Sequence, residues 1–102
     1  MVIELNETNF DEKIKKGIVV VDFWAPWCGP CRKLGPVIEK IAAENTDIMV
    51  AKVNLDEAPS IATKFNVLSI PTVIIFKDGE FADQSVGLVS EEKILEKINS
   101  VK

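Results

Sequence analysis

One almost unbroken apolar run, Ile18–Trp24, limits most strongly the folds open to this chain. Its β-branched residues predict a strand, and the lack of polar alternation predicts that both faces of this strand are buried. A second run, Ile48–Leu55, predicts a neighbouring central strand. Strands buried on both faces occur in sheets that are covered by helices on each side. The sequence therefore predicts an α/β fold.

The segments around these two runs alternate between helical and strand patterns. Further strands are predicted at Val2–Leu5, Val73–Lys77 and Phe81–Val86, with an Asp78-Gly79 hairpin turn between the last two. Helices are predicted from a cap at Asn9 to Lys16, from Cys31 to Asn45 with Pro36 inside, from Ala58 to Phe65, and after a cap at Ser90. The order β-α-β-α-β-α-β-β-α requires parallel crossovers first and an antiparallel hairpin last, so the sheet is predicted to be mixed.

Length and charge narrow the functions open to the chain. Its 102 residues fit one domain, residues 1–102. The net charge of −4 argues against nucleic acid or a membrane as the main partner, because both favour clustered positive charge. The absence of histidine excludes imidazole-based catalysis and imidazole metal sites. Because no run could span a bilayer and no secretory signal pattern opens the sequence, we expect a cytoplasmic protein.

Two cysteines lie between the end of a predicted central strand and the start of a predicted helix. Cys28 and Cys31 are one helical turn apart, so their sulfurs can form a reversible disulfide. Free backbone N–H groups and the helix dipole stabilise a thiolate at a helix N-terminus, so the pKa of Cys28 is expected to be lowered. Cys28 is therefore predicted to be the attacking nucleophile. Cys31, one turn inside the helix, is predicted to resolve the mixed disulfide.

Other interpretations of the cysteine pair have less support. A zinc site needs about four ligands, whereas this chain offers two cysteines and no histidine. A cluster shared between two chains has no supporting motif, and two inert core cysteines are the remaining alternative. The strand–turn–helix context favours redox chemistry, and no metal site is expected.

The segment Val21–Cys31 closely resembles the active-site segment of the thioredoxin family. The likeness covers essentially the whole chain and continues at Pro36, Ala51–Asp56, Ile70–Thr72, Phe76–Gly79 and Val86–Gly87. It implies a thioredoxin-like three-layer sandwich, with a central mixed sheet of about five strands and helices on both faces. It also implies a redox-active Cys28–Cys31 disulfide that reduces disulfide-containing proteins without a cofactor. Recycling by a thioredoxin reductase, and a monomeric state, are further expectations.

Asp22 and Lys52 each interrupt an otherwise apolar central strand. A buried carboxylate must be protonated, paired or hydrated, and Lys52 is its natural partner. One interpretation is a tolerated buried pair that only lowers stability. The other, which the resemblance favours, is that Asp22 has a raised pKa and transfers the proton of Cys31.

The predicted substrate-binding surface surrounds the dithiol. Pro71 is expected to follow a cis bond facing the dithiol, as the family implies, although a trans proline at a strand start is the alternative. The Ile70 backbone could then pair with an extended substrate. The uncharged collar is predicted to comprise Trp27, Gly29, Pro30, Leu55, Ile70, Gly87 and Leu88. Leu88 departs from the small residue that the family leads us to expect.

Two functions compete with protein-disulfide reduction. An oxidant or isomerase would use the same chemistry in reverse, but Gly29-Pro30 resembles the reducing members of the family. A binding or assembly subunit would use the apolar collar without the thiols. Replacing Cys28 and Cys31 with serine separates this last function from the other two, because a pure binding module would keep its activity.

Overall fold

The computed structural model describes residues 1–102, which form a five-stranded sheet and four helices. The strands are β1 (Val2–Leu5), β2 (Ile18–Trp24), β3 (Met49–Asn54), β4 (Thr72–Lys77) and β5 (Glu80–Val86). The helices are α1 (Phe10–Lys13), α2 (Gly29–Glu44), α3 (Pro59–Lys64) and α4 (Glu91–Val101). The predicted order of elements along the chain is confirmed.

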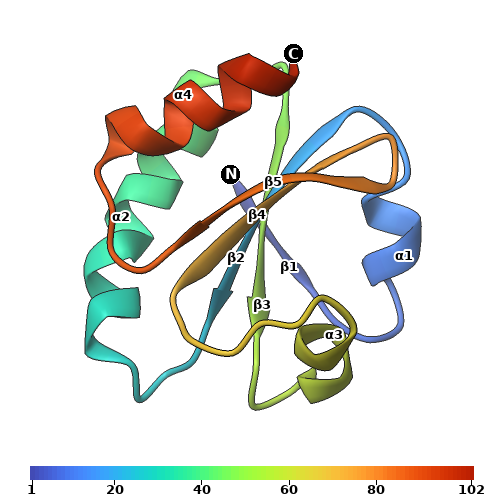
Figure 1. Ribbon diagram of the computed structural model, residues 1–102, viewed down its shortest axis with the longest axis vertical. Helices are drawn as coiled ribbons and strands as arrows, with labels where there is room; N and C mark the ends of the chain where they lie inside the picture. The colour runs from blue at the N-terminus through green and yellow to red at the C-terminus, as the bar shows by residue number, and fades with distance from the viewer.

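The sheet has the strand order β1-β3-β2-β4-β5 (Figure 1). β3 pairs in parallel with β1 and β2, whereas β4 runs antiparallel to both β2 and β5. The Asp78-Gly79 turn has the positive φ angles, +51° and +89°, that a tight hairpin of this hand requires. The predicted mixed sheet and α/β fold class are therefore confirmed.

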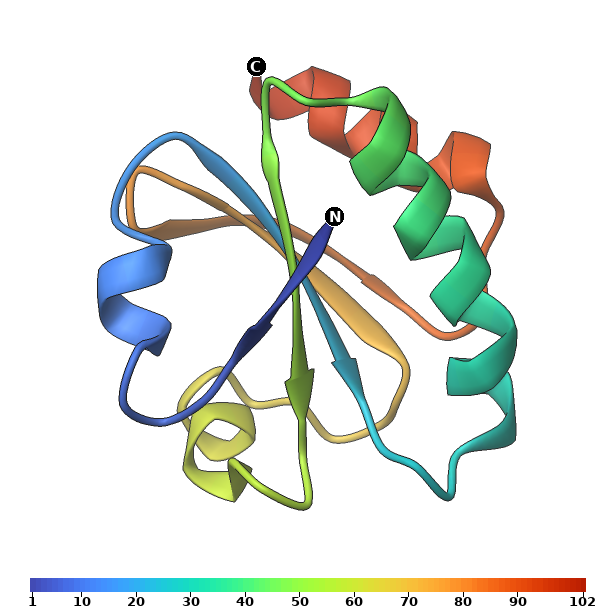
Figure 2. The same ribbon diagram turned by 180° about the vertical axis from the view of Figure 1, so that it is seen from behind.

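Helices cover both faces of the sheet, as the apolar central strands require. α2 and α4 lie on one face, and α1 and α3 lie on the other (Figures 1 and 2). Within β2, Val19, Val21 and Phe23 belong to the α1–α3 core, whereas Val20 belongs to the α2–α4 core. None of the helices has the length and apolar composition that crossing a membrane demands.

The first helix is shorter than predicted, which corrects the expectation that it extends to Lys16. α1 ends at Lys13, and the side chain of Asn9 accepts the Asn6 N–H instead of capping the helix. Gly17, with φ +70°, turns the chain into β2 and donates its N–H to Asp78 Oδ1 at 2.9 Å. This contact joins segments 61 residues apart in the sequence and fixes the chain between α1 and β2.

The second helix begins earlier than predicted, at Gly29 and not at Cys31. Pro30 lies in its first turn, where the missing N–H of proline removes no helical hydrogen bond. This shift places Cys28 at the cap and Cys31 inside the first turn. The cysteines therefore follow the C-terminal end of β2, which lies at the lower edge of the sheet in Figure 1.

Candidate active site

Cys28 and Cys31 form a disulfide at the N-terminus of α2. Their Cα atoms lie 5.3 Å apart, which is within the ordinary range for a disulfide. Cys28 is the N-cap residue, and its Sγ accepts the backbone N–H of Cys31 at 3.2 Å. A sulfur that carries negative charge at this point receives a backbone hydrogen bond together with the positive end of the helix dipole.

Both sulfurs are largely shielded from solvent. Cys28 is 5% exposed and Cys31 is 4% exposed, and they pack in a small cluster with Ala25, Trp24 and Ile70. The Ile70-Pro71 peptide bond is cis, and the Ile70 carbonyl oxygen lies 3.9 Å from Cys28 Sγ. The loop before β4 therefore lies directly against Cys28 Sγ, and the cis bond expected from the sequence is present.

The loop after β5 is held against the same segment. Gly87, with φ +92°, donates its N–H to the Pro71 carbonyl oxygen at 2.8 Å. Pro71 is itself buried, whereas Ile70 before it is partly exposed. Three loops, those after β2, before β4 and after β5, consequently meet at the disulfide.

Asp22 lies on β2 in register with Lys52 on β3, and it is 4% exposed. Burial raises the pKa of Asp22 from 3.8 to about 7, and the positive charge of Lys52 partly opposes that rise. Asp22 Oδ1 has no hydrogen-bond partner, and neither residue takes part in an ion pair. Lys52 therefore acts on Asp22 through its charge and not through a direct contact.

Trp24 connects this carboxyl to the disulfide cluster. Its ring packs against the cysteines, and Lys52 Nζ lies 5.3 Å from the ring centroid, in range of a cation–π interaction. Trp24 Nε1 is buried and has no hydrogen-bond partner. Lys52 thus lies beside both the Asp22 carboxyl and the Trp24 ring. The sequence pattern did not indicate its contact with the ring.

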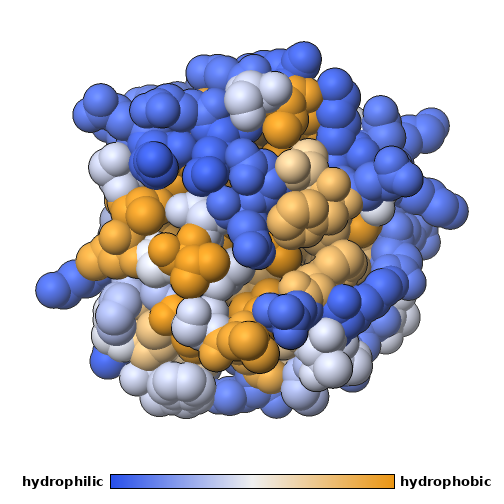
Figure 3. Space-filling model, viewed as in Figure 1, coloured by the Kyte–Doolittle hydropathy of each residue, from blue (hydrophilic) through white to orange (hydrophobic).

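Only some residues of the expected collar are exposed, and one of the exposed residues makes a polar contact. Trp27 is 67% exposed and donates its Nε1 hydrogen to Asp56 Oδ1 at 3.2 Å, so Asp56 has a polar contact at the rim. Gly29, Pro30 and Leu88 are exposed, whereas Leu55, Ile70 and Gly87 are partly buried. Figure 3 shows apolar side chains gathered on the face that carries β4 and β5.

Leu68 was missed by the sequence analysis. It precedes Ile70 by two residues and is 87% exposed, the most exposed apolar side chain apart from the N-terminal Met1. A leucine in a loop that touches the dithiol is a substrate-contact candidate. The available signal was its position two residues before Ile70-Pro71.

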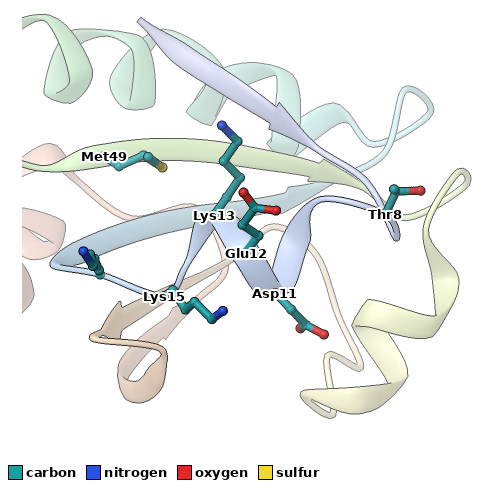
Figure 4. Close-up of a pocket in the computed structure, with 7 residues that line it drawn as sticks. Thr8, Asp11, Glu12, Lys13, Lys15 and Met49 are labelled. Atoms are coloured by element: carbon teal, nitrogen blue, oxygen red, sulfur yellow. The ribbon is translucent and has the colours of Figure 1, made fainter.

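The largest cleft, about 730 Å³, lies apart from the disulfide beside α1 and β3 (Figure 4). It is lined by Thr8, Asp11, Glu12, Lys13, Lys15, Lys16 and Met49. These side chains carry both signs of charge and include no pair of nucleophiles. No group of three or more Cys, Asp and Glu side chains could hold a metal ion together. The dithiol is therefore the chemically distinctive site.

Comparison with known proteins agrees with this geometry. A family model described as thioredoxin matches residues 1–100. The thioredoxin of Staphylococcus haemolyticus is 47% identical over 98 residues, covering 93% of this chain and 92% of that protein. The thioredoxin of Staphylococcus saprophyticus is 45% identical, covering 95% and 94%, and one from Staphylococcus aureus is 44% identical, covering 93% and 92%.

Proposed function

The chain belongs to the thioredoxin family of thiol-disulfide oxidoreductases, and on that premise we propose how its residues carry out protein-disulfide reduction. The observation that supports the proposal most strongly is Cys28 at the N-cap of α2, with the Cys31 N–H directed at its sulfur. In the reduced protein, the same contacts would stabilise a Cys28 thiolate.

The reaction proceeds by two exchanges. The Cys28 thiolate attacks one sulfur of the substrate disulfide, and the other substrate sulfur leaves as a thiolate. Cys31 loses its proton and attacks Cys28 Sγ, so the Cys28–Cys31 bond forms as the bond to the substrate breaks. The substrate disulfide gains two electrons, and the protein dithiol is oxidised to the disulfide.

Asp22 is the proposed proton acceptor for Cys31. Burial raises its pKa to about 7, which suits proton transfer at neutral pH. Asp22 and Cys31 line one cavity of about 180 Å³, so a water molecule between them can carry the proton. Lys52 tunes this carboxyl through its charge.

Substrates would be disulfide-containing proteins that dock in an extended form against the collar. The Ile70 backbone can pair with such a segment, while Trp27, Leu68 and Leu88 supply apolar contacts. The oxidised protein would be recycled by a thioredoxin reductase. We further propose that it acts as a monomer, without a bound cofactor, in the cytoplasm.

Insulin reduction tests these roles directly. Turbidity is followed as the insulin disulfides are reduced, with dithiothreitol or a thioredoxin reductase as electron donor. We expect Cys28→Ser to abolish catalysis and Cys31→Ser to accumulate a mixed disulfide that denaturing electrophoresis without reductant can detect. Accumulation of the mixed disulfide on Cys31 in Cys28→Ser, and not on Cys28 in Cys31→Ser, would reverse the assigned roles.

A further inference from the structure

Two cavities adjoin the buried carboxyl of Asp22 on the α2 side of the sheet. One, about 180 Å³, is also lined by Trp24, Cys31 and Arg32, and the other, about 150 Å³, by Val2, Ile38 and Glu39. Asp22, Lys52 and Gly35 line both cavities. Cys31 therefore lies at one of two cavities that meet at Asp22, and the exposed Glu39 lies at the other.

Two buried polar atoms at these cavities lack the hydrogen-bond partners that water can supply. Asp22 Oδ1 and Trp24 Nε1 are buried without hydrogen-bond partners, although buried polar atoms are seldom left unpaired. Each cavity exceeds the roughly 30 Å³ that one water molecule occupies in the liquid. Water in this space can therefore satisfy both atoms and reach the Asp22 carboxyl.

Gly35 lines both cavities from α2. It is the only residue of α2 that lines both, and a Cβ placed there would meet no atom within 4 Å. A larger side chain at this position has open space in front of it, and the two cavities that Gly35 lines are also lined by Asp22. A glycine also eases the clash between the Pro36 ring and the preceding residue, so stability alone does not reveal its role.

We propose that Gly35 holds open a water passage through which Asp22 exchanges its proton with solvent during disulfide exchange. This inference rests on the proposed role of Asp22 as proton acceptor for Cys31. Once Asp22 has taken the Cys31 proton, and the substrate thiolate has left to be protonated by solvent, Asp22 must release its proton to water. Gly35 is a positioning residue in this sense, because it shapes the passage and touches no reacting atom.

The passage opens away from the docking surface. Glu39 lies eight residues beyond Cys31 in α2, about 12 Å along the helix. A substrate seated on the collar would therefore leave the Glu39 end open to water. The charged groups around Asp22 are Lys52 on β3, Arg32 and Glu39 on α2, and Glu4, which continues the same row on β1. β4 places the apolar Val73 opposite Asp22.

The test fills the passage with Gly35→Leu and, more mildly, with Gly35→Ala. Ala43→Leu is the matched control, because it places the same leucine side chain at an exposed position of α2. Stopped-flow measurement of substrate release from the mixed disulfide gives the rate, and carbon NMR gives the Asp22 pKa. Nuclear Overhauser effects between water and the amides of Gly35 and Cys31 report water in the passage.

We expect Gly35→Leu to lose the water signals, raise the Asp22 pKa by about one unit and slow release about tenfold. Gly35→Ala should fall between Gly35→Leu and the parent, and Ala43→Leu should match the parent. In an Asp22→Asn background, Gly35→Leu should slow release no further.

Two results for Gly35→Leu would overturn the proposal. One is substrate release at the parental rate although the water signals are lost, and the other is water signals that persist. These results are distinguishable from a failure of the proposed function. If Asp22→Asn releases substrate at the parental rate, Asp22 is not the proton acceptor, and the passage proposal falls with it. If Asp22→Asn is slow and Gly35→Leu is not, only the passage proposal fails.

Discussion

Replacing Asp22 with asparagine removes a carboxyl whose ionisation opposes folding. The pKa of Asp22 rises on folding from 3.8 to about 7, because the side chain is 4% exposed and loses its hydration. Since one pKa unit corresponds to about 1.4 kcal/mol, ionised Asp22 lowers the free energy of unfolding by about 4 kcal/mol. Asparagine has nearly the same shape and does not titrate.

The effect has a defined pH window. Below pH 3.8, Asp22 is protonated in both the folded and the unfolded chain, so it adds no pH dependence. Between pH 3.8 and about 7 the unfolded chain releases the proton while the folded chain retains it, so stability falls as pH rises. Above about pH 7 both states are ionised and the loss is complete.

Urea unfolding of the oxidised parent and Asp22→Asn, from pH 4 to pH 8, measures this difference. As the pH rises from 4 to 8, the free energy of unfolding of the variant, relative to that of the parent, should increase by about 4 kcal/mol. The variant should also catalyse insulin reduction more slowly than the parent. Any fixed cost of burying the asparagine amide cancels when the two ends of the range are compared. A stability difference that is the same at pH 4 and pH 8 would refute the pKa assignment.

Three further predictions test the surroundings of the dithiol. Lys52→Met should raise the pKa of Asp22 further above 7, because the lysine charge lowers it, and NMR titration of the carboxyl carbon measures the change; a fall would contradict the electrostatic role. Trp27→Ala should raise the KM for insulin severalfold and leave urea stability within about 0.5 kcal/mol, because the side chain is 67% exposed; an unchanged KM would remove Trp27 from substrate binding. Leu34→Ala, in the α2–α4 core, should lower the free energy of unfolding by about 3 kcal/mol in the same urea assay, and a loss below about 1 kcal/mol would contradict its tight packing.

Much of the fold could be predicted because its central strands are unambiguous. Ile18–Trp24 lies between two helical layers, and its apolar side chains face both, so its composition alone indicated a strand buried on both sides. The hairpin was also readable, because Asp78 and Gly79 are residues that tolerate positive φ. The end of α1 was not readable, since Lys15 and Lys16 suit a helix by composition although the chain leaves the helix after Lys13.

The residues of the site could be predicted from the sequence, whereas many of the contacts between their side chains could not. Asp22 and Lys52 drew notice because each interrupts an apolar strand, and the register of β2 with β3 places them side by side. That Lys52 lies over the Trp24 ring and makes no ion pair with Asp22 depends on rotamers, which sequence patterns do not encode. The exposure of Leu68 likewise depends on the path of its loop.

The central claim is that the start of α2 keeps the Cys28 sulfur ionised at neutral pH. Alkylation of the reduced protein with iodoacetamide from pH 4 to pH 10, read out by peptide mass spectrometry, tests it most directly. We predict that Cys28 is labelled first, with a midpoint clearly below the ordinary thiol pKa of about 8.5. Equal and slow labelling of Cys28 and Cys31, or earlier labelling of Cys31, would contradict the account.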